Sequence, residues 1–528
     1  MQNGWSRKVY LKLEPPAPED NRPDSERILE AVGKLPEFSG KQLRMGISAL
    51  RALYPLCPES GWEITVTLGY DGSGWEIVRA EPGDTTGYHY GLCADLGSTT
   101  IAMEAVDMRD GTVAGSVSVF NPQIRFGEDI LTRIFYAKDQ PERLEEIRMA
   151  TVEGIRLAIE ELERQTGIRA EESAALIIAG NTTMTHFLLG LDAFCVFQTP
   201  YAVHTLMPEV YRAGELDLPL EGFVYCYPGR ANYLGGDIIS GMIATELSEQ
   251  EGISVFLDIG TNGELVIGNR DFLICGAGAA GPALEGGVVR TGMRAEPGAV
   301  DQVRITDGKP KVHVIGGGAP RGICGSGIVE LLSELFLNGW MDLRGKLIPG
   351  ASGYICVEDG EAGVEYAPGL VFSERDIEEF LRTKAAAGTM VEYMMQQIGI
   401  TMDDVERFYV AGAFGTHISK EAGVTIGLYP DIPRDKIVSP GNTSLTGARK
   451  MLLDIGRKQQ AEQLLDRMDY IQFGAVEDFV HLMGAAMAFP HTDLERYPSV
   501  QRELKRRGRP CSRGRRGQDG NARGARGG

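Results

Sequence analysis

The sequence predicts an α/β protein built from two similar lobes and preceded by a small α+β unit. Two segments far apart in the chain, residues 90–107 and 254–268, share the pattern of apolar strand, glycine turn and second strand. Each is followed by apolar residues at helical spacing, interleaved with short buried strands. This repetition indicates an internal duplication by pattern rather than by close identity, and it implies two α/β lobes.

The chain is expected to open with a linker and then the small unit. Residues 1–24 are rich in proline and charge and are interpreted as a linker. Residues 25–86 are expected to form the small α+β middle domain. Its expected helices lie at 24–32 and 39–54, and its expected strands lie at 62–70 and 75–81. Aspartate, glycine and serine between the two strands are typical of a hairpin turn.

The first lobe is expected over residues 87–250 and the second over 251–495. Expected strands of the first lobe are 90–95, 100–107, 112–120 and 175–179, and its expected helices are 130–137, 141–165, 182–189 and 237–247. Expected strands of the second lobe are 254–258, 264–268 and 407–411, and its expected helices are 325–338, 373–398 and 443–454. Residues 496–528 are expected to form a basic tail rich in arginine and glycine that is disordered, and binding of RNA or of an acidic partner is the alternative.

Charge and composition exclude several classes of function. The chain has 528 residues, of which 43% are hydrophobic and 24% charged, as in ordinary soluble proteins. It has no long apolar run and no signal-peptide core, so we expect a cytoplasmic protein without membrane contact. A net charge of −20 argues against nucleic-acid binding by the main body. The eight cysteines form no closely spaced cluster, so no iron–sulfur cluster is expected in this chain.

A first glycine turn contains residues suited to binding phosphate, namely Asp95, Gly97, Ser98, Thr99 and Thr100. A tight glycine turn lets backbone N–H groups approach phosphate oxygens, and the hydroxyl groups add donors. An aspartate at the strand end can hold Mg²⁺ through water or orient an attacking water. By itself, this pattern is more often an ordinary hairpin, because an aspartate followed by glycine and a hydroxyl residue is common by chance.

A second turn repeats the pattern with Asp258, Gly260, Thr261, Asn262 and Gly263. Two such turns, each opening a lobe, are what a cleft needs to hold a triphosphate from both sides. The sequence has no P-loop and no dinucleotide fingerprint in a suitable context. The pair of turns therefore predicts ATP binding between the lobes, with Asp95 and Asp258 near the metal.

Small residues end a later strand at Gly412, Ala413, Phe414 and Gly415. Small side chains there would let a flat adenosine lie against the backbone, although a turn that packs a strand on a helix is the alternative. We interpret these four residues as an adenosine-binding segment.

Two further positions have two interpretations each. Gly180 and Asn181 lie where a strand runs into a helix N-terminus, which attracts anions, but Asn181 is equally good as a helix cap. Asp237 begins a helix after two glycines and is either a plain cap or a carboxylate near the metal. We include Asp237 with Asp95 and Asp258 as candidate catalytic residues.

The order and spacing of these turns resemble the actin-like ATPase superfamily, whose lobes are ribonuclease-H-like. Further motifs resemble one family within it, the reductive activators of corrinoid enzymes. These motifs are Asn121-Pro122-Gln123, Phe126-Gly127-Glu128-Asp129, residues 179–184, 258–264, 281–287 and 411–415, and Gly441-Asn442. They occur in order, and the resemblance covers about residues 8–500.

The resemblance implies ATP-dependent reductive activation of a corrinoid protein, supporting the reduction of cobalt(II) to cobalt(I), with ATP and Mg²⁺ as cofactors. The partner would be a corrinoid protein of a methyltransferase system or a corrinoid iron–sulfur protein. Members of the family usually carry an N-terminal [2Fe–2S] domain, whereas this chain begins at the linker. The electron is therefore expected from a separate iron–sulfur partner or a missing domain. The resemblance also suggests a homodimer.

Two other functions stay open at this point. A small-molecule kinase on the same fold would need a carboxylate base facing an acceptor pocket, for which Glu285 or Asp237 would serve. A non-enzymatic actin-like scaffold that polymerises with ATP is the third hypothesis.

Overall fold

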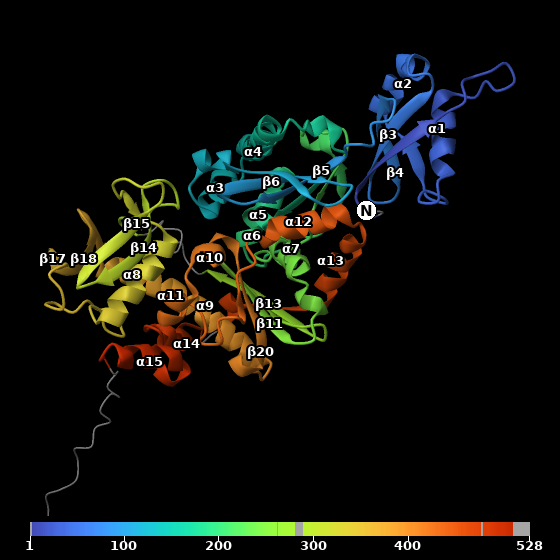
Figure 1. Cartoon of the computed structure of the whole chain (residues 1–528). Coiled ribbons are helices and arrows are strands. Elements are labelled where there is room, and N and C mark those ends of the chain that lie inside the picture. The colour runs from blue at the N-terminus through green and yellow to red at the C-terminus, as the bar shows by residue number, and fades with distance from the viewer. Residues whose placement is uncertain (1–2, 261, 280–288, 359, 477–478, 510–528) are drawn as a thin grey trace, which may run out of the picture.

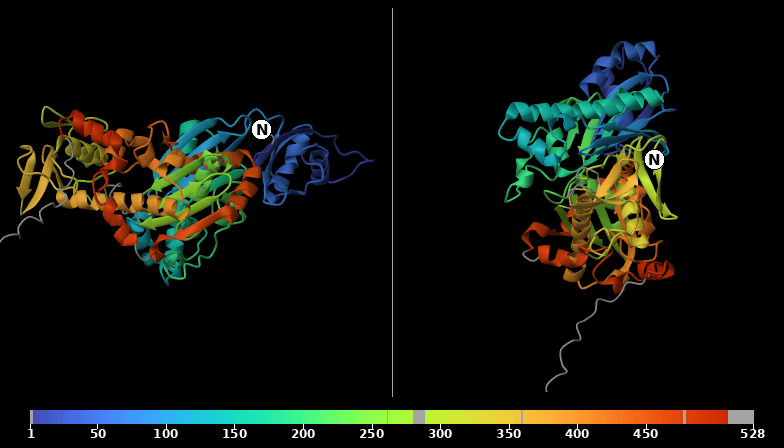
Figure 2. Two further views of the ribbon diagram at one scale, coloured as in Figure 1. Left: turned by 90° about the horizontal axis from the view of Figure 1, so that it is seen from below. Right: turned by 90° about the vertical axis from the view of Figure 1, so that its left-hand side faces the viewer.

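The computed structural model describes residues 3–260, 262–279, 289–358, 360–476 and 479–509 (Figure 1). The described strands form two six-stranded sheets, one four-stranded sheet and two three-stranded sheets. The four-stranded sheet lies at one end of the molecule and the two three-stranded sheets at the other, with the two lobes between them (Figures 1 and 2). Among the described helices, none has both the length and the apolar character that crossing a membrane requires.

The N-terminal unit consists of a four-stranded sheet and two helices. Its strands, in sheet order, are β1 (Ser6–Lys12), β3 (Glu63–Tyr70), β4 (Trp75–Pro82) and β2 (Leu43–Met45). The helices are α1 (Asp24–Gly33) and α2 (Ile47–Glu59), and they bury Val32 and Leu53 against Ile64 and Val66 of β3. The small α+β unit that the sequence predicts is therefore present.

Two details of this unit differ from the sequence prediction. The segment interpreted as a linker contributes β1, which pairs with β3 in antiparallel fashion along its whole length. The signal was the alternation of Val9, Leu11 and Leu13, which the prolines and charges that follow obscured. The second helix begins at Ile47 rather than at residue 39, because the short strand β2 precedes it.

The first lobe is built on the sheet β7-β6-β5-β8-β10-β9. Its strands are β5 (Tyr90–Leu96), β6 (Thr100–Asp107), β7 (Val113–Phe120), β8 (Ala175–Gly180), β9 (Val210–Arg212) and β10 (Phe223–Cys226). Its helices include α3 (Ile130–Ala137), α4 (Pro141–Thr166), α5 (Thr182–Leu188), α6 (Phe194–Phe197) and α7 (Gly236–Thr245). The long helix α4 packs against β6 and β7 through apolar residues that recur at helical spacing.

The second lobe is built on the sheet β21-β20-β11-β12-β13-β22. Its strands are β11 (Ile253–Ile259), β12 (Asn262–Gly268), β13 (Leu273–Ala279), β20 (Val405–Ala411), β21 (Ile437–Val438) and β22 (Met468–Gln472). Its helices include α9 (Glu374–Gln397), α10 (Gly412–His417), α11 (Lys420–Thr425), α12 (Thr443–Leu453) and α13 (Gly456–Arg467).

The two sheets share one topology. In each, three antiparallel strands are followed by two strands parallel to the first of them, so β7-β6-β5-β8-β10 corresponds to β13-β12-β11-β20-β21. This correspondence confirms the internal duplication that the sequence predicts. Equivalent turns, after β5 and after β11, therefore occupy equivalent places in the two lobes.

An insertion and a C-terminal segment extend the second lobe. Between β13 and α9 lie β14 (Ala299–Thr306), β15 (Lys309–Val314), β16 (Gly322–Ile323), α8 (Gly325–Asn338), β17 (Ile355–Glu358), β18 (Glu361–Ala367) and β19 (Leu370–Ser373). The chain continues after β22 through α14 (Phe479–Ala486) to α15 (Pro498–Arg506). The expectation of a tail from residue 496 is wrong for α15, because Val500 and Leu504 lie one turn apart and are buried in the core of the lobe.

Helices α7 and α12 pack against each other between the two six-stranded sheets (Figure 1). The Ser240 hydroxyl of α7 donates to the Ser444 carbonyl of α12 at 2.6 Å. Tyr227 donates through its hydroxyl to the Gly447 carbonyl at 2.8 Å. One apolar core contains residues of both sheets together with these helices, so α7 and α12 form the layer that joins the lobes.

The start of the chain lies at the far end of α12. The Trp5 backbone N–H donates to the Leu452 carbonyl at 3.0 Å, and the Ile455 N–H donates to the Asn3 carbonyl at 2.7 Å. The Trp5 ring stacks on Tyr225 of β10 with 5.0 Å between centroids and meets Tyr70 of β3 edge-on at 5.5 Å. Residues 3–5 therefore bind to the lobes before the chain enters the N-terminal unit.

Candidate functional site

Three aspartates from three elements face one another where the lobes meet: Asp95 in β5, Asp258 in β11 and Asp237 in the first turn of α7. Burial raises the pKa of Asp237 to about 7, and the charges of Asp258 and Asp95 contribute to this shift. Burial raises the pKa of Asp258 to about 6, again with a contribution from Asp95. Each carboxylate thus lies within electrostatic reach of the other two.

This cluster differs from a direct metal site. Within the described part of the chain, no three acidic, histidine or cysteine side chains are gathered closely enough to hold a metal ion. Mg²⁺ usually keeps several of its waters and takes only one or two protein carboxylates, together with substrate phosphates. Buried carboxylates that repel one another suit such a hydrated cation, since its charge would relieve both their desolvation and their repulsion.

The first glycine turn is held in place by hydrogen bonds that its backbone carbonyl groups accept. A Cβ on Gly97 would lie 2.5 Å from the Thr100 carbonyl oxygen, so the turn needs glycine at this position. The Asn121 side-chain amide donates to the Gly97 carbonyl at 2.9 Å, and the Asn121 backbone N–H donates to the Thr99 carbonyl at 2.9 Å. Arg133 Nη1 donates to the Ser98 carbonyl at 2.6 Å. Three consecutive carbonyls therefore bind to the segment that follows β7.

Arg133 is a fully buried arginine behind this turn. Its Nε donates to the Gly127 carbonyl at 2.8 Å, and its Nη1 also donates to Gln123 Oε1 at 3.2 Å. Burial lowers the pKa of Arg133 to about 10, so the side chain still carries its charge at neutral pH. Two motifs that support the family resemblance, at 121–123 and 126–129, thus surround a fixed positive charge next to the first glycine turn.

The stretch around Gly180 lies beside the first turn. Because β5 and β8 are parallel, Leu96 pairs with Gly180 at their carboxyl ends. Asn181 Oδ1 accepts a hydrogen bond from the Met184 N–H at 2.9 Å, which confirms the capping interpretation of Asn181. A phosphate contact of Gly180 or Asn181 stays a prediction.

Asp237 is not the cap of its helix. Gly235 holds the N-cap position of α7, and Asp237 lies two residues further on, where its Oδ1 accepts from the Ile238 N–H at 2.9 Å. A Cβ on Gly235 would lie 2.6 Å from the Cα of Asn181, so the loop before Asp237 packs on the start of α5. The plain-cap interpretation is therefore wrong, and Asp237 joins the other two aspartates.

The second turn meets the predicted adenosine segment. Strands β11 and β20 are parallel, and Asp258 pairs with Ala411 at their carboxyl ends. Gly412 follows with φ of +76°, and a Cβ there would lie 2.7 Å from Asp258 Oδ1, so only glycine fits beside this carboxylate. Residues 412–415 open the short helix α10, which is the strand–helix turn named as the alternative. Adenosine binding by this segment stays a prediction.

The remaining predicted residues occupy the turns and strands between these points. Ser98 and Thr99 lie in the first turn, Thr100 begins β6, Gly260 lies in the second turn, Asn262 and Gly263 belong to β12, and Ala413, Phe414 and Gly415 belong to α10. Thr261 and Glu285 lie outside the described residues, as does the 281–287 motif.

Asn442 is a site residue that the sequence analysis missed. Its Nδ2 donates to Asp95 Oδ2 at 2.8 Å, while its Oδ1 accepts from the Leu445 N–H at 2.8 Å and caps α12. Burial raises the pKa of Asp95 to about 6, and the Asn442 hydrogen bond opposes this rise. The available signal was the Gly441-Asn442 pair, which contributed to the resemblance but carried no role.

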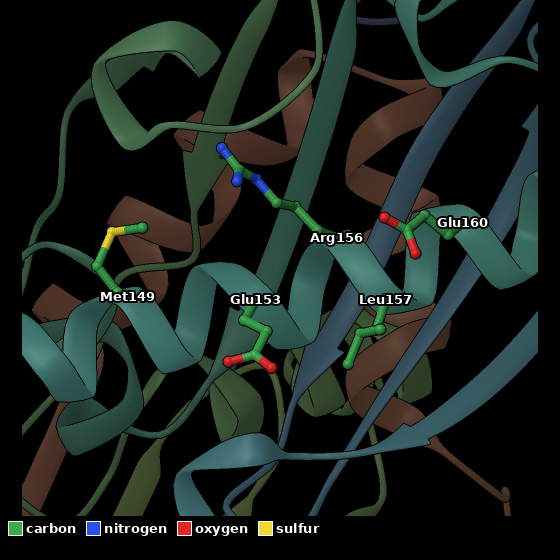
Figure 3. A pocket seen from close by; sticks show the side chains of 5 residues that line it. All are labelled: Met149, Glu153, Arg156, Leu157 and Glu160. Carbon is green, nitrogen blue, oxygen red and sulfur yellow. The ribbon is translucent and has the colours of Figure 1, made fainter.

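A surface pocket lies elsewhere, on the outer face of α4 (Figure 3). Its lining residues are Met149, Glu153, Arg156, Leu157 and Glu160. All five belong to this one helix, and none is a predicted site residue. This pocket therefore contains none of the residues of the candidate nucleotide site.

Three family models match nearly the whole chain. The model described as the C-terminal domain of RACo, the ASKHA domain, matches residues 252–501. The RACo middle region matches residues 90–250, and the RACo linker region matches residues 5–87.

Named relatives agree with these matches. The corrinoid activation enzyme RamQ of Eubacterium limosum is 30% identical over 382 residues, which are 69% of this chain and 64% of that protein. The [Co(II) methylated amine-specific corrinoid protein] reductase of Methanosarcina barkeri is 26% identical over 281 residues, which are 48% of this chain and 49% of that protein. The chain thus spans less than two thirds of the length of both relatives.

A solved structure agrees over a larger share. The reductive activator for corrinoid, iron–sulfur protein superposes with a TM-score of 0.85 and 32% identity, covering 94% of this chain and 81% of that one. Together with the duplicated lobes, these matches confirm both the family resemblance and the fold class read from the sequence. This chain belongs to the family of reductive activators of corrinoid proteins, and its lobes have the actin-like ATPase fold.

Proposed function

We propose that this protein uses ATP to drive the reductive activation of a corrinoid protein, supporting the reduction of cobalt(II) to cobalt(I). The observation that carries the proposal is the meeting of Asp95, Asp237 and Asp258 between two glycine turns, in a chain of this family. The electron comes from an iron–sulfur protein or domain outside the chain. The corrinoid partner belongs to a methyltransferase system or is itself a corrinoid iron–sulfur protein.

Each predicted residue has a role in this scheme. The two turns bind the triphosphate from opposite lobes, assisted by Gly180 and Asn181, and residues 412–415 seat the adenosine. Asp95 and Asp258 would hold Mg²⁺, whose charge would offset that of the phosphates. Asp237, with a pKa of about 7, suits a general base that orients and deprotonates the attacking water. The positive charge of Arg133 lies behind the first turn and favours the bound polyphosphate.

The energetics require coupling between nucleotide and partner. Each ~59 mV of unfavourable one-electron potential costs about a factor of ten in the equilibrium. Moving a two-state balance from mostly open to mostly closed takes about 5.5 kcal/mol of differential binding. Closure of the lobes on ATP, together with binding of the corrinoid protein, supplies energy on this scale, and hydrolysis then resets the cycle. The protein acts in the cytoplasm as a homodimer in this scheme.

The test begins with calorimetry of Mg–ATP binding to the whole chain. We expect binding, slow hydrolysis by the protein alone, and faster hydrolysis when a cobalt(II) corrinoid protein is added. Undetectable ATP binding contradicts the scheme. Phosphate transfer to a small acceptor would instead favour the kinase hypothesis, and sedimentation of polymers with ATP would favour the scaffold hypothesis.

A further inference from the structure

The side-chain amide of Asn442 makes two hydrogen bonds with different roles, one through its oxygen and one through its nitrogen. The oxygen accepts from the Leu445 N–H and thereby caps α12. The nitrogen donates to Oδ2 of Asp95 on the first lobe's central strand β5. Within the described residues, no other side chain donates a hydrogen bond to Asp95.

The cap alone does not explain asparagine at this position. Serine, threonine and aspartate cap helices about as well, because each offers a side-chain oxygen. An aspartate here would place a second carboxylate against Asp95, and a serine hydroxyl is too short to span both partners. Only a side chain with an acceptor and a donor on one rigid plane can cap α12 and hold Asp95 at the same time.

Asn442 is held in place because α12, which it caps, packs against neighbouring elements. Ser444 accepts from Ser240 of α7 at 2.6 Å, and Arg449 Nη1 lies 3.1 Å from Glu104 Oε2 of β6. Helix α12 therefore packs firmly on both α7 and the first lobe. A donor on a rigid helix end restricts the rotation of the Asp95 carboxylate, which otherwise has a broad two-fold torsion.

We propose that Asn442 is a positioning residue for ATP hydrolysis. It binds Oδ2 of Asp95 and fixes this carboxylate, so that Oδ1 would hold a hydrated Mg²⁺ or the attacking water in one orientation. This inference rests on the proposed ATPase function and deepens it. It predicts that the amide donor of Asn442 matters for turnover much more than for nucleotide affinity or for stability.

The decisive variant is Asn442→Ser, which keeps a cap oxygen on α12 and removes the donor to Asp95. We expect kcat for ATP hydrolysis to fall roughly 10–100-fold, as for other residues that orient a catalytic group. The dissociation constant for a non-hydrolysable ATP analogue and the melting temperature should stay close to the wild-type values. Asn442→Asp, which also caps α12, should lower kcat further because it adds a like charge beside Asp95.

Loss of a helix cap is controlled separately. Ser373 caps α9, where the insertion of the second lobe ends, and Ser373→Ala should lower the melting temperature while leaving kcat unchanged. If Asn442→Ser or Asn442→Asp retains the wild-type kcat, the positioning role is overturned while the ATPase function stands. If the wild-type protein itself neither binds nor hydrolyses ATP, the proposed function fails and this inference fails with it.

Discussion

Burial raises the pKa values of Asp95, Asp237 and Asp258 to about 6, 7 and 6, and repulsion from neighbouring aspartates contributes at Asp237 and Asp258. The corresponding value in an unfolded chain is about 3.9. The folded protein therefore binds protons more tightly than the unfolded chain between about pH 4 and about pH 7. The stability that protonation contributes is fully present below about pH 4 and is lost as the pH rises through 6 to 7.

We therefore expect the nucleotide-free protein to melt at a higher temperature at about pH 6 than at about pH 8. Mg–ATP should reduce this difference, because a bound cation stabilises the charged carboxylates. Differential scanning calorimetry with and without Mg–ATP measures both effects. A melting temperature that rises from pH 6 to pH 8 would contradict the assignment of raised pKa values to this cluster.

Asp237→Asn removes one charge from the cluster without changing its size. The variant should be more stable than the wild type at about pH 8 and should show a weaker pH dependence of melting, because one of the raised pKa values is gone. ATP hydrolysis should fall by two orders of magnitude or more if Asp237 is the general base, as is usual when such a base is removed. Asp403→Asn, at an exposed position, is the matched control and should change neither property.

Arg133→Met tests the charge behind the first turn. The change leaves the carbonyls of Ser98 and Gly127 without their donor, and each such loss costs about 1–3 kcal/mol. We expect a lower free energy of unfolding in urea and a weaker affinity for ATP by calorimetry. Arg125→Met, at an exposed ion pair with Glu153, should leave both nearly unchanged. Equal ATP affinity in the two variants would count against a role for Arg133.

The sequence alone identified the site residues that belong to a repeated motif. It did not identify those whose hydrogen-bond partners lie elsewhere in the chain. Asp95 and Asp258 were predictable because each stands at the same point of a recurring strand–turn–strand pattern. Asn442 and Arg133 were not, because their roles depend on partners far away in the chain. Asn442 reaches Asp95 across 347 positions, and Arg133 looks like an ordinary helix residue until its burial is known.

Among the helices and strands, α15 shows that two apolar residues one turn apart can fold a segment onto the core although its composition is strongly basic. Val500 and Leu504 are 2% and 3% exposed, although arginine and lysine surround them in the sequence. The same effect hid β1, whose alternating apolar residues precede a stretch rich in proline. The helices and strands around the predicted turns were predictable because long periodic segments surround them, whereas the strands of the insertion carry only short and weak patterns.

Two truncations separate α15 from the residues that follow it. Ending the chain after Arg509 should leave the melting temperature unchanged, because α15 is retained. Ending it after Tyr497 removes Val500 and Leu504, whose burial stabilises the lobe by about 1.5–3 kcal/mol each. We expect that second protein to unfold at a clearly lower urea concentration. Identical urea midpoints for the two truncations would show that α15 contributes nothing to the lobe.

At the scale of the whole molecule, the duplicated sheets explain why the candidate site is built from two similar turns, one from each lobe. Equivalent turns after β5 and β11 bring Asp95 and Asp258 to the same place from opposite lobes, while α7 and α12 form the layer between them. The fold class could be predicted from this duplication in the sequence. The way the lobes join could not be predicted, since the packing of α7 on α12 depends on contacts between segments about 200 positions apart.

The anchorage of residues 3–5 at the end of α12 changes what the N-terminal unit can do. The chain attaches to the lobes at Asn3 and Trp5, leaves to build the small sheet, and returns to them at β5. Arg79 adds a further contact by donating to the Glu171 carbonyl at 3.1 Å. A unit tethered by one linker reorients freely, whereas one attached at both ends of its chain is restrained. The unit is also braced at its side, because Arg212 of the first lobe pairs with Glu76 and Phe223 packs with Val78. Any reorientation of this unit therefore has to break contacts along β4 as well as those at residues 3–5.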